Sequence, residues 1–218
     1  MNSGIILPGA LNLAVNPLAH KPGDMIRCLN VENDQFGAKK KRPGYVTYLG
    51  TANGSVIQDL ATYQRNNGTQ FWHYRLSGGL LYYSTQGTGE WTICGNGTLS
   101  ASGTLCTAVL EDTFMVGDGV SATRHSTDGT SFTNTTSAPI AVDMEDYQNR
   151  VYIAGTASTL FWSVAGTPVN WTAADSSSIN IPGPGKLTTN RKLDDRLITG
   201  KNSGIQHRWD GYNLFDLS

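Results

Sequence analysis

The chain has 218 residues and a formal net charge of −1 at pH 7, and only 15% of its residues are charged. This balance gives no electrostatic reason to expect the chain as a whole to bind nucleic acid or a membrane surface. No apolar run is long enough to span a bilayer, and the first ten residues lack the basic segment and apolar core of a signal peptide. We therefore expect no membrane insertion.

Glycine is abundant, with 25 residues, and Ser, Thr and Asn are frequent. These residue types form tight turns and polar strand faces, so the composition favours many short strands. The three cysteines, Cys28, Cys94 and Cys106, are odd in number and irregularly spaced. That pattern argues against a disulfide framework or a zinc site, and the four histidines are dispersed as well. We expect reduced thiols, no metal and no cofactor.

Residues 1–50 differ from the rest because proline-containing turns interrupt them repeatedly. The turns are Pro8-Gly9, Asn16-Pro17, Pro22-Gly23 and Pro43-Gly44. The segment is predicted to form an extended arm with one or two strands. An arm with so little core of its own must pack on the rest of the chain or on a neighbouring subunit. The side chains expected at that contact are Leu11, Leu13, Val15, Ile26 and Val31.

The only basic run is Lys39, Lys40, Lys41 and Arg42. One interpretation is a contact with DNA in a channel or with an acidic neighbour. The other, which we favour, is a solvated turn that ends at Pro43-Gly44.

From residue 51 onward the chain repeats one pattern: a strand, a polar turn containing Gly, and then an aromatic residue. The clearest copies are 81–92 and 160–172, a shorter copy is 123–133, and a degenerate copy is 205–216. Three serines and one arginine mark the repeats, at spacings of 42, 37 and 45 residues: Ser84, Ser126, Ser163 and Arg208. A period near 40 residues with several short strands per unit is typical of β-propeller blades.

Residues 51–218 therefore predict an all-β domain of β-propeller-like repeats, with about four blades of about 40 residues. Two arrangements fit this count: a closed four-bladed ring, or a part-ring completed by another chain. The aromatic residue that ends each motif is predicted to lie in the core between adjacent blades. These residues are Trp91, Phe132, Trp171 and Phe215.

The motifs that suggest chemistry are better explained by structure. The segment 126–132 resembles the Asp-box turn of sialidase-like propellers, which is a structural element there. The spacing of the acidic pairs Glu111-Asp112, Glu145-Asp146 and Asp194-Asp195 predicts one shared blade position, and adjacent strand residues point to opposite faces. We read these pairs as turns and predict that the protein is not an enzyme.

A second hypothesis is carbohydrate recognition. Five aromatic residues near the motifs are candidates for a rim on which sugars stack: Tyr82, Tyr83, Trp162, Trp209 and Tyr212. The polar residues around them do not repeat from blade to blade, whereas the motif's aromatic ending does. The pattern therefore favours a repeated core over a repeated binding site. A glycan on a host surface is the ligand that this alternative implies.

The first 45 residues resemble the amino-terminal signature of structural proteins of the tail nozzle or tail tip of tailed bacteriophages. The matching segments, in order, are 9–13, 16–18, 22–24, 30–31 and 37–45. The resemblance implies a virion protein, assembled in the bacterial cytoplasm, that forms a ring with copies of itself in the tail or neck. Other tail or neck proteins are implied partners, and DNA passes transiently through the channel. Nozzle proteins are much longer, so the chain is a minimal version, a different tail or neck part, or a fragment.

Overall fold

The computed structural model describes residues 31–33, 39–41, 54–65, 70–85 and 90–217. It divides into two units, Met1–Thr47 and Tyr48–Ser218. In the first unit, β1 (Val31–Asn33) and β2 (Lys39–Lys41) pair antiparallel, with Val31 opposite Lys41. Lys39 to Lys41 are therefore extended, and the predicted turn at this run is wrong for these three residues. The other predicted arm contacts (Leu11, Leu13, Val15 and Ile26) and Arg42 lie outside the described residues.

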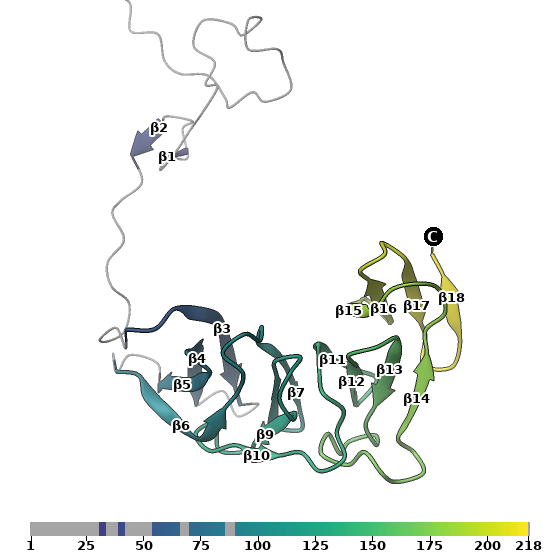
Figure 1. The fold of residues 1–218 in the computed structure, drawn as a ribbon, viewed down its shortest axis with the longest axis horizontal. Helices are drawn as coiled ribbons and strands as arrows, with labels where there is room; N and C mark the ends of the chain where they lie inside the picture. The colour runs from purple at the N-terminus through teal and green to yellow at the C-terminus, as the bar shows by residue number, and fades with distance from the viewer. Residues whose placement is uncertain (1–30, 34–38, 42–53, 66–69, 86–89, 218) are drawn as a thin grey trace, which may run out of the picture. The chain divides into compact units, whose positions relative to one another are not determined.

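The second unit contains four sheets that follow one another along the chain (Figure 1). The first sheet comprises β3 (Ile57–Gln64), β4 (Phe71–Ser77), β5 (Leu80–Thr85) and β6 (Thr92–Thr98). The second comprises β7 (Cys106–Leu110), β8 (Thr113–Gly117), β9 (Arg124–Ser126) and β10 (Thr133–Asn134). The third comprises β11 (Asp143–Tyr147), β12 (Arg150–Ala154), β13 (Thr159–Trp162) and β14 (Ser177–Asn180). The fourth comprises β15 (Leu187–Leu193), β16 (Arg196–Lys201), β17 (Gln206–Trp209) and β18 (Leu214–Asp216).

Each sheet is a four-stranded antiparallel meander in which neighbours in sequence are neighbours in space. Tight hairpins make this order: Gly78 and Gly79 adopt positive φ between β4 and β5, as do Gln148 and Asn149 between β11 and β12. Glycine and asparagine accept this left-handed conformation at low cost. The fold is all-β and built from propeller-like repeats, as the period near 40 residues predicted.

The second strand of each sheet is its most buried part. All five residues of β8 are buried, as are four of the five residues of β12. Both faces of these strands are covered because a sheet packs on each side of them, and their sequences are accordingly rich in β-branched and large apolar residues.

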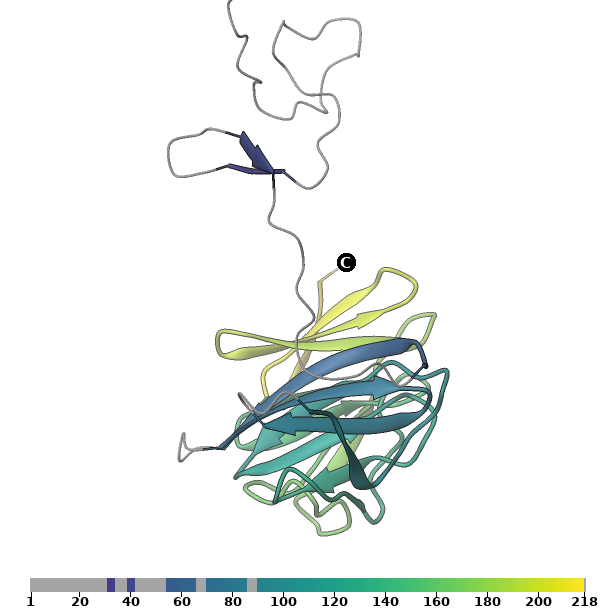
Figure 2. The same cartoon turned by 90° about the vertical axis from the view of Figure 1, so that its left-hand side faces the viewer.

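Three hydrophobic clusters join the sheets in succession. Tyr63 and Trp72 of the first sheet pack with Phe114 of the second. Met115 packs with Ile153 between the second and third sheets. Between the third and fourth sheets the cluster includes Tyr147, Tyr152, Leu197 and Trp209. Within the part of the chain that the structure describes, no cluster joins the first sheet to the fourth. Figure 2 looks onto the first sheet, whose strands cross in front of the others.

The strand pairing corrects the alignment of the fourth repeat. Ser126 lies opposite Phe114, and Trp209 lies opposite Leu197 at the equivalent place. The residue that corresponds to the buried serines at 84, 126 and 163 is therefore Trp209, one position after Arg208. The degenerate motif had shifted the alignment because an aromatic replaces the serine.

The four aromatic residues predicted between blades have different environments. Phe132 is fully buried between the first and second sheets, and Trp171 packs at the edge of the cluster between the second and third. Trp91 is half-buried, and the Arg75 guanidinium carbon lies 4.8 Å from the centroid of the Trp91 ring. Phe215 is 38% exposed, which contradicts the prediction for this residue. Its strand belongs to the last described sheet, so no following sheet covers it.

Candidate functional site

One position shows where the stack of sheets is open. The strand register places four residues at one repeat position near the end of the first strand of each sheet: Tyr63, Leu110, Tyr147 and Leu193. Tyr63 is 1% exposed and Tyr147 is 3% exposed, because the next sheet covers each ring. Leu110 is half-buried against the third sheet. Leu193 is 61% exposed, so the equivalent face of the fourth sheet is uncovered in the described structure.

The two tyrosines also anchor the following sheet. The Tyr63 hydroxyl donates a hydrogen bond to the Asp112 carbonyl at 2.6 Å, and the Tyr147 hydroxyl donates to the Asp195 carbonyl at 2.5 Å. Burial raises the pKa of both phenols, so both remain donors at neutral pH. Leu193 makes no such bond because it has no hydroxyl.

We call the uncovered side of the fourth sheet the open face. The strand register places Leu193, Arg196, Ile198, Arg208 and Phe215 on this side. Arg191, opposite Ile198, starts on the same side and is bonded to Asp143 at 2.7 Å. The Arg208 guanidinium lies 4.0 Å from the centroid of the Phe215 ring, and Arg196 Nε lies 3.4 Å from Asp195 Oδ1. Arg208 is thus stabilised by an aromatic ring and Arg196 by a carboxylate. The open face therefore combines apolar side chains with partly compensated positive charges.

A pocket of about 380 Å³ lies between the third sheet and the β17–β18 turn of the fourth. Its lining side chains are mainly polar and aromatic: Gln148, Arg150, Tyr152, Trp162, Asp175 and Tyr212. A volume of this size and a lining that mixes rings with a few polar groups are typical of small-ligand sites.

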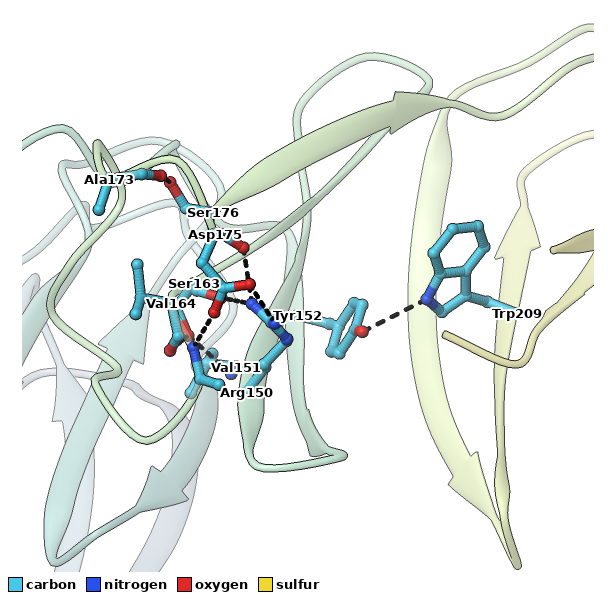
Figure 3. A network of polar contacts seen from close by, with 10 residues as sticks. Arg150, Val151, Tyr152, Ser163, Val164, Ala173, Asp175, Ser176 and Trp209 are labelled. Carbon is cyan, nitrogen blue, oxygen red and sulfur yellow. Dashed lines mark hydrogen bonds and ion pairs between the residues drawn. The ribbon is translucent and has the colours of Figure 1, made fainter. Parts of the chain in front are cut away.

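Three hydrogen bonds hold the Arg150 guanidinium against one wall of this pocket. One terminal nitrogen donates to the Ser163 carbonyl at 2.9 Å and to the Asp175 carbonyl at 2.7 Å, and the other donates to Asp175 Oδ1 at 2.7 Å (Figure 3). Asp175 Oδ2 also accepts from the Ala165 amide at 3.2 Å. The Arg150 hydrogen bond, followed by the Ala165 amide, lowers the pKa of Asp175. The pocket wall is therefore a neutral, pre-formed ion pair.

The other wall is aromatic. Trp162 stacks on Trp209 with ring centroids 5.4 Å apart, and it lies 6.0 Å from the Tyr152 ring. Trp209 Nε1 donates to the Tyr152 hydroxyl at 3.3 Å (Figure 3). Burial raises the pKa of Tyr152, so its phenol is protonated at neutral pH. Tyr212, which is 88% exposed, also lines the pocket.

The structure does not assemble the predicted aromatic rim. Trp162 and Tyr212 line the same pocket, whereas Trp209 is 4% exposed and serves the core. Tyr82 is 9% exposed in the first sheet, and Tyr83 is half-buried there. Sequence reasoning missed Gln148, Arg150 and Asp175, because only the fold brings the loop at residue 175 beside β12.

Asp118 and Lys201 are buried charged residues at the same repeat position, five residues after the start of the second strand of their sheets. Each hydrogen-bonds to the backbone of the segment that follows the preceding sheet, and we call this arrangement a charged clamp. Asp118 accepts from the Ser100 amide of the preceding sheet at 2.5 Å, and from the amides of Val120 and Ser121. Lys201 Nζ instead donates to the carbonyls of Ile181, Pro182 and Gly183. Burial of Asp118 is outweighed by its amide donors, so its pKa is lowered. A carboxylate and an ammonium thus make the same clamp with opposite polarity.

The motifs considered for catalysis form turns and strands. In the segment resembling an Asp-box, Asp128 Oδ1 accepts from the amides of Thr130 and Ser131, and Gly129 donates to Ser126 Oγ. Glu111, Asp112 and Asp194 have positive φ in hairpin turns. Glu145-Asp146, however, lies within β11, so the assignment of this pair to the same turn position is wrong.

The remaining candidates concern cysteines, metals and membranes. Cys94 and Cys106 are free and buried, and burial raises the pKa of the Cys94 thiol to about 12. Among the described residues, no group of three or more His, Cys, Asp or Glu side chains could hold a metal ion. In the same part of the chain, no helix has the length and apolar character needed to cross a membrane.

The chain resembles solved structures in fold alone. No protein-family profile and no curated protein matches it. YCF48 from Cyanidioschyzon merolae superposes with a TM-score of 0.54 at 10% identity, over 78% of this chain and 58% of that one. A BBS1N chain solved in complex with ARL6DN gives a TM-score of 0.50 at 13% identity, over 79% and 57%. Both are β-propeller proteins, and this chain spans under three fifths of their length.

Proposed function

We propose that the chain is a non-enzymatic structural protein of a tailed-bacteriophage virion. It forms part of the tail, at the nozzle, tail tip or neck, by associating with copies of itself. The observation that carries the proposal is the open face of the fourth sheet. The resemblance of residues 1–45 to tail nozzle and tail-tip proteins supports the virion setting.

The repeat itself supports the need for a partner at the open face. The position of Leu193 is covered by a following sheet in the first three repeats, and burial of a leucine side chain stabilises by about 1.5–3 kcal/mol. In repeat architectures each unit buries its apolar face against a neighbour, and an uncovered terminal face favours association.

The partner that fits the open face is the first sheet of another copy. On the side opposite Tyr63, the first sheet presents Leu60 and Ile93, which are 65% and 54% exposed. Apolar side chains thus lie on both ends of the stack. A head-to-tail contact between these different faces propagates around a ring when its rotation closes.

The arm has a second role in this assembly. We expect residues 1–45 to reach a neighbouring subunit and to add strand pairing there, with β1 and β2 as the paired segment. Lys39 to Arg42 would then contact DNA in the channel or an acidic tail protein. Other tail or neck proteins bind the completed ring.

The test is the molar mass of the full chain in solution, measured by light scattering across a range of concentrations. We expect a ring that Leu193→Lys converts to smaller species, because a charge replaces an apolar contact. Val120→Lys is the matched control, since Val120 is 56% exposed in the segment between β8 and β9. A chain that stays monomeric, or a Leu193→Lys variant that forms the same ring as the unchanged protein, contradicts the proposal.

The arm is tested separately by deletion of residues 1–45. We expect the shortened chain to keep the circular dichroism and cooperative unfolding of the repeat domain but to form no ring. Full rings from the shortened chain would show that the arm is not needed for assembly.

A further inference from the structure

The pocket between the third and fourth sheets occupies a place that the first interface fills with a side chain. Trp72 pairs with Tyr63, and Arg150 pairs with Tyr147, so Trp72 and Arg150 hold the same repeat position. Trp72 is 3% exposed and stacks on Tyr63 with centroids 5.2 Å apart. Arg150 instead turns toward Asp175, and about 380 Å³ is left open.

The turns above the two places are also equivalent. Asp128 Oδ1 accepts from two amides of its turn at 2.7 and 2.8 Å, and Asp210 Oδ1 accepts from two amides at 2.9 and 2.7 Å. Gly129 lies so close to Trp72 that an added Cβ would come within 2.6 Å of the indole. Gly211, its counterpart, lines the pocket. The end of the Gln148 side chain lies against Gly211, where its Nε2 donates to the Asp210 carbonyl at 3.0 Å. The repeat therefore builds a slot that a ring fills at the first place, whereas at the second a smaller amide takes only part of it and the pocket remains.

The tyrosines below the slot complete the comparison. The Tyr74 hydroxyl donates to the Gly129 carbonyl at 2.6 Å, which closes the first slot. Tyr152 holds the equivalent position, but its hydroxyl accepts from Trp209 Nε1. Among the described residues no acceptor is bonded to the Tyr152 hydroxyl proton, so a bound ligand can accept it.

The lining specifies the chemistry of the ligand. Trp162 and Tyr212 provide ring faces for the C–H surface of a sugar, and Gln148, Asp175 and the Tyr152 hydroxyl provide hydrogen-bonding groups for its hydroxyls. Arg150 and Asp175 neutralise each other at 2.7 Å, so the pocket offers no net charge to an anion. Polar groups on one wall disfavour a purely apolar aromatic side chain.

We propose that this pocket binds one neutral pyranose residue of a glycan. The site is distinct from the open face and does not depend on the assembly proposed above. A single hexose has few atoms, so its Kd is on the order of 1 mM. A ring of subunits multiplies such weak sites, which strengthens binding to a glycan-bearing surface.

The experiment is saturation-transfer NMR and calorimetry on the full chain with the methyl glycosides of glucose, galactose, mannose and N-acetylglucosamine. We expect saturable binding of at least one probe. Tyr212→Ala should weaken it about 3-fold to 10-fold, because one stacking face is lost from an exposed side chain. Tyr212→Phe, which keeps the ring, should bind like the unchanged protein.

A second variant is designed to block the pocket with a larger side chain. Ala165 is exposed and lines the pocket, so Ala165→Phe should abolish binding while the protein stays folded. Val56→Ala, at a side chain that is 81% exposed outside both proposed contacts, is the control and should bind normally. No saturable binding of any probe overturns the proposal. Binding that neither Tyr212→Ala nor Ala165→Phe changes also overturns it, as does binding only of a tryptophan-containing peptide.

Discussion

The first and third interfaces between sheets use one backbone arrangement with different contents. Between the first and second sheets, Trp72, Tyr63 and Phe114 form a stack with centroid distances of 5.2 and 4.9 Å. Between the third and fourth sheets, Arg150 takes the place of Trp72 and bonds outward to Asp175. The repeat thus keeps its strand register while the side chain at one position decides whether the interface is packed or holds a pocket.

The largest expected difference concerns the two residues at the equivalent position. Trp72→Ala removes a buried ring and should lower the free energy of unfolding by about 3–5 kcal/mol. Arg150→Ala removes a partly exposed ion pair and should cost about 1 kcal/mol or less. Urea unfolding followed by fluorescence measures both. Equal losses would show that the third interface is as tightly packed as the first.

Substitution of the charged clamp residues, Asp118 and Lys201, should cause the next largest loss of unfolding free energy. Asp118→Ala leaves the Ser100, Val120 and Ser121 amides without their acceptor, and Lys201→Met leaves three carbonyls without their donor. Each substitution should cost about 2–3 kcal/mol, since hydrogen bonds to charged groups are the stronger ones. The same unfolding experiment tests this, with Val56→Lys, at a side chain that is 81% exposed, as the control. A loss under about 0.5 kcal/mol for either variant would contradict the clamp.

Alanine substitution of the two turn glycines, Gly129 and Gly211, should give a smaller difference in stability. Both have positive φ, 78° at Gly129 and 99° at Gly211, so alanine is strained at each. Gly129→Ala also drives a Cβ into the Trp72 ring, whereas Gly211→Ala meets the end of the Gln148 side chain. We expect Gly129→Ala to cost about 1–2 kcal/mol more than Gly211→Ala. The difference in melting temperature between the two variants measures this, and a reversed order would refute it.

The smallest effect is a pH dependence at the first interface. The pKa of Asp118 is lower in the folded protein than in the unfolded chain, because amide donors outweigh its burial. Its contribution to stability is therefore fully present above the unfolded pKa, near 4, and is lost as the pH falls through the folded pKa. Asp118→Asn should flatten the fall in stability below about pH 4. An unchanged pH profile in this variant would contradict the assignment.

The sequence predicted the number and order of the sheets, because the spacing of Ser84, Ser126 and Ser163 reflects one strand register repeated. It mispredicted Phe215, since a motif cannot show whether a following sheet is present. The pocket was beyond prediction from sequence. Its formation depends on where Arg150 turns, and that is decided by Asp175, 25 residues away.

The most direct test of the central claim is a cryo-EM map of the assembly formed by the full chain. The account predicts a closed ring in which the open face around Leu193 and Phe215 is covered by the first sheet of the next subunit. It also predicts that residues 1–45 bridge subunits. A map in which Leu193 faces solvent in every subunit, or in which no ring forms, would contradict it.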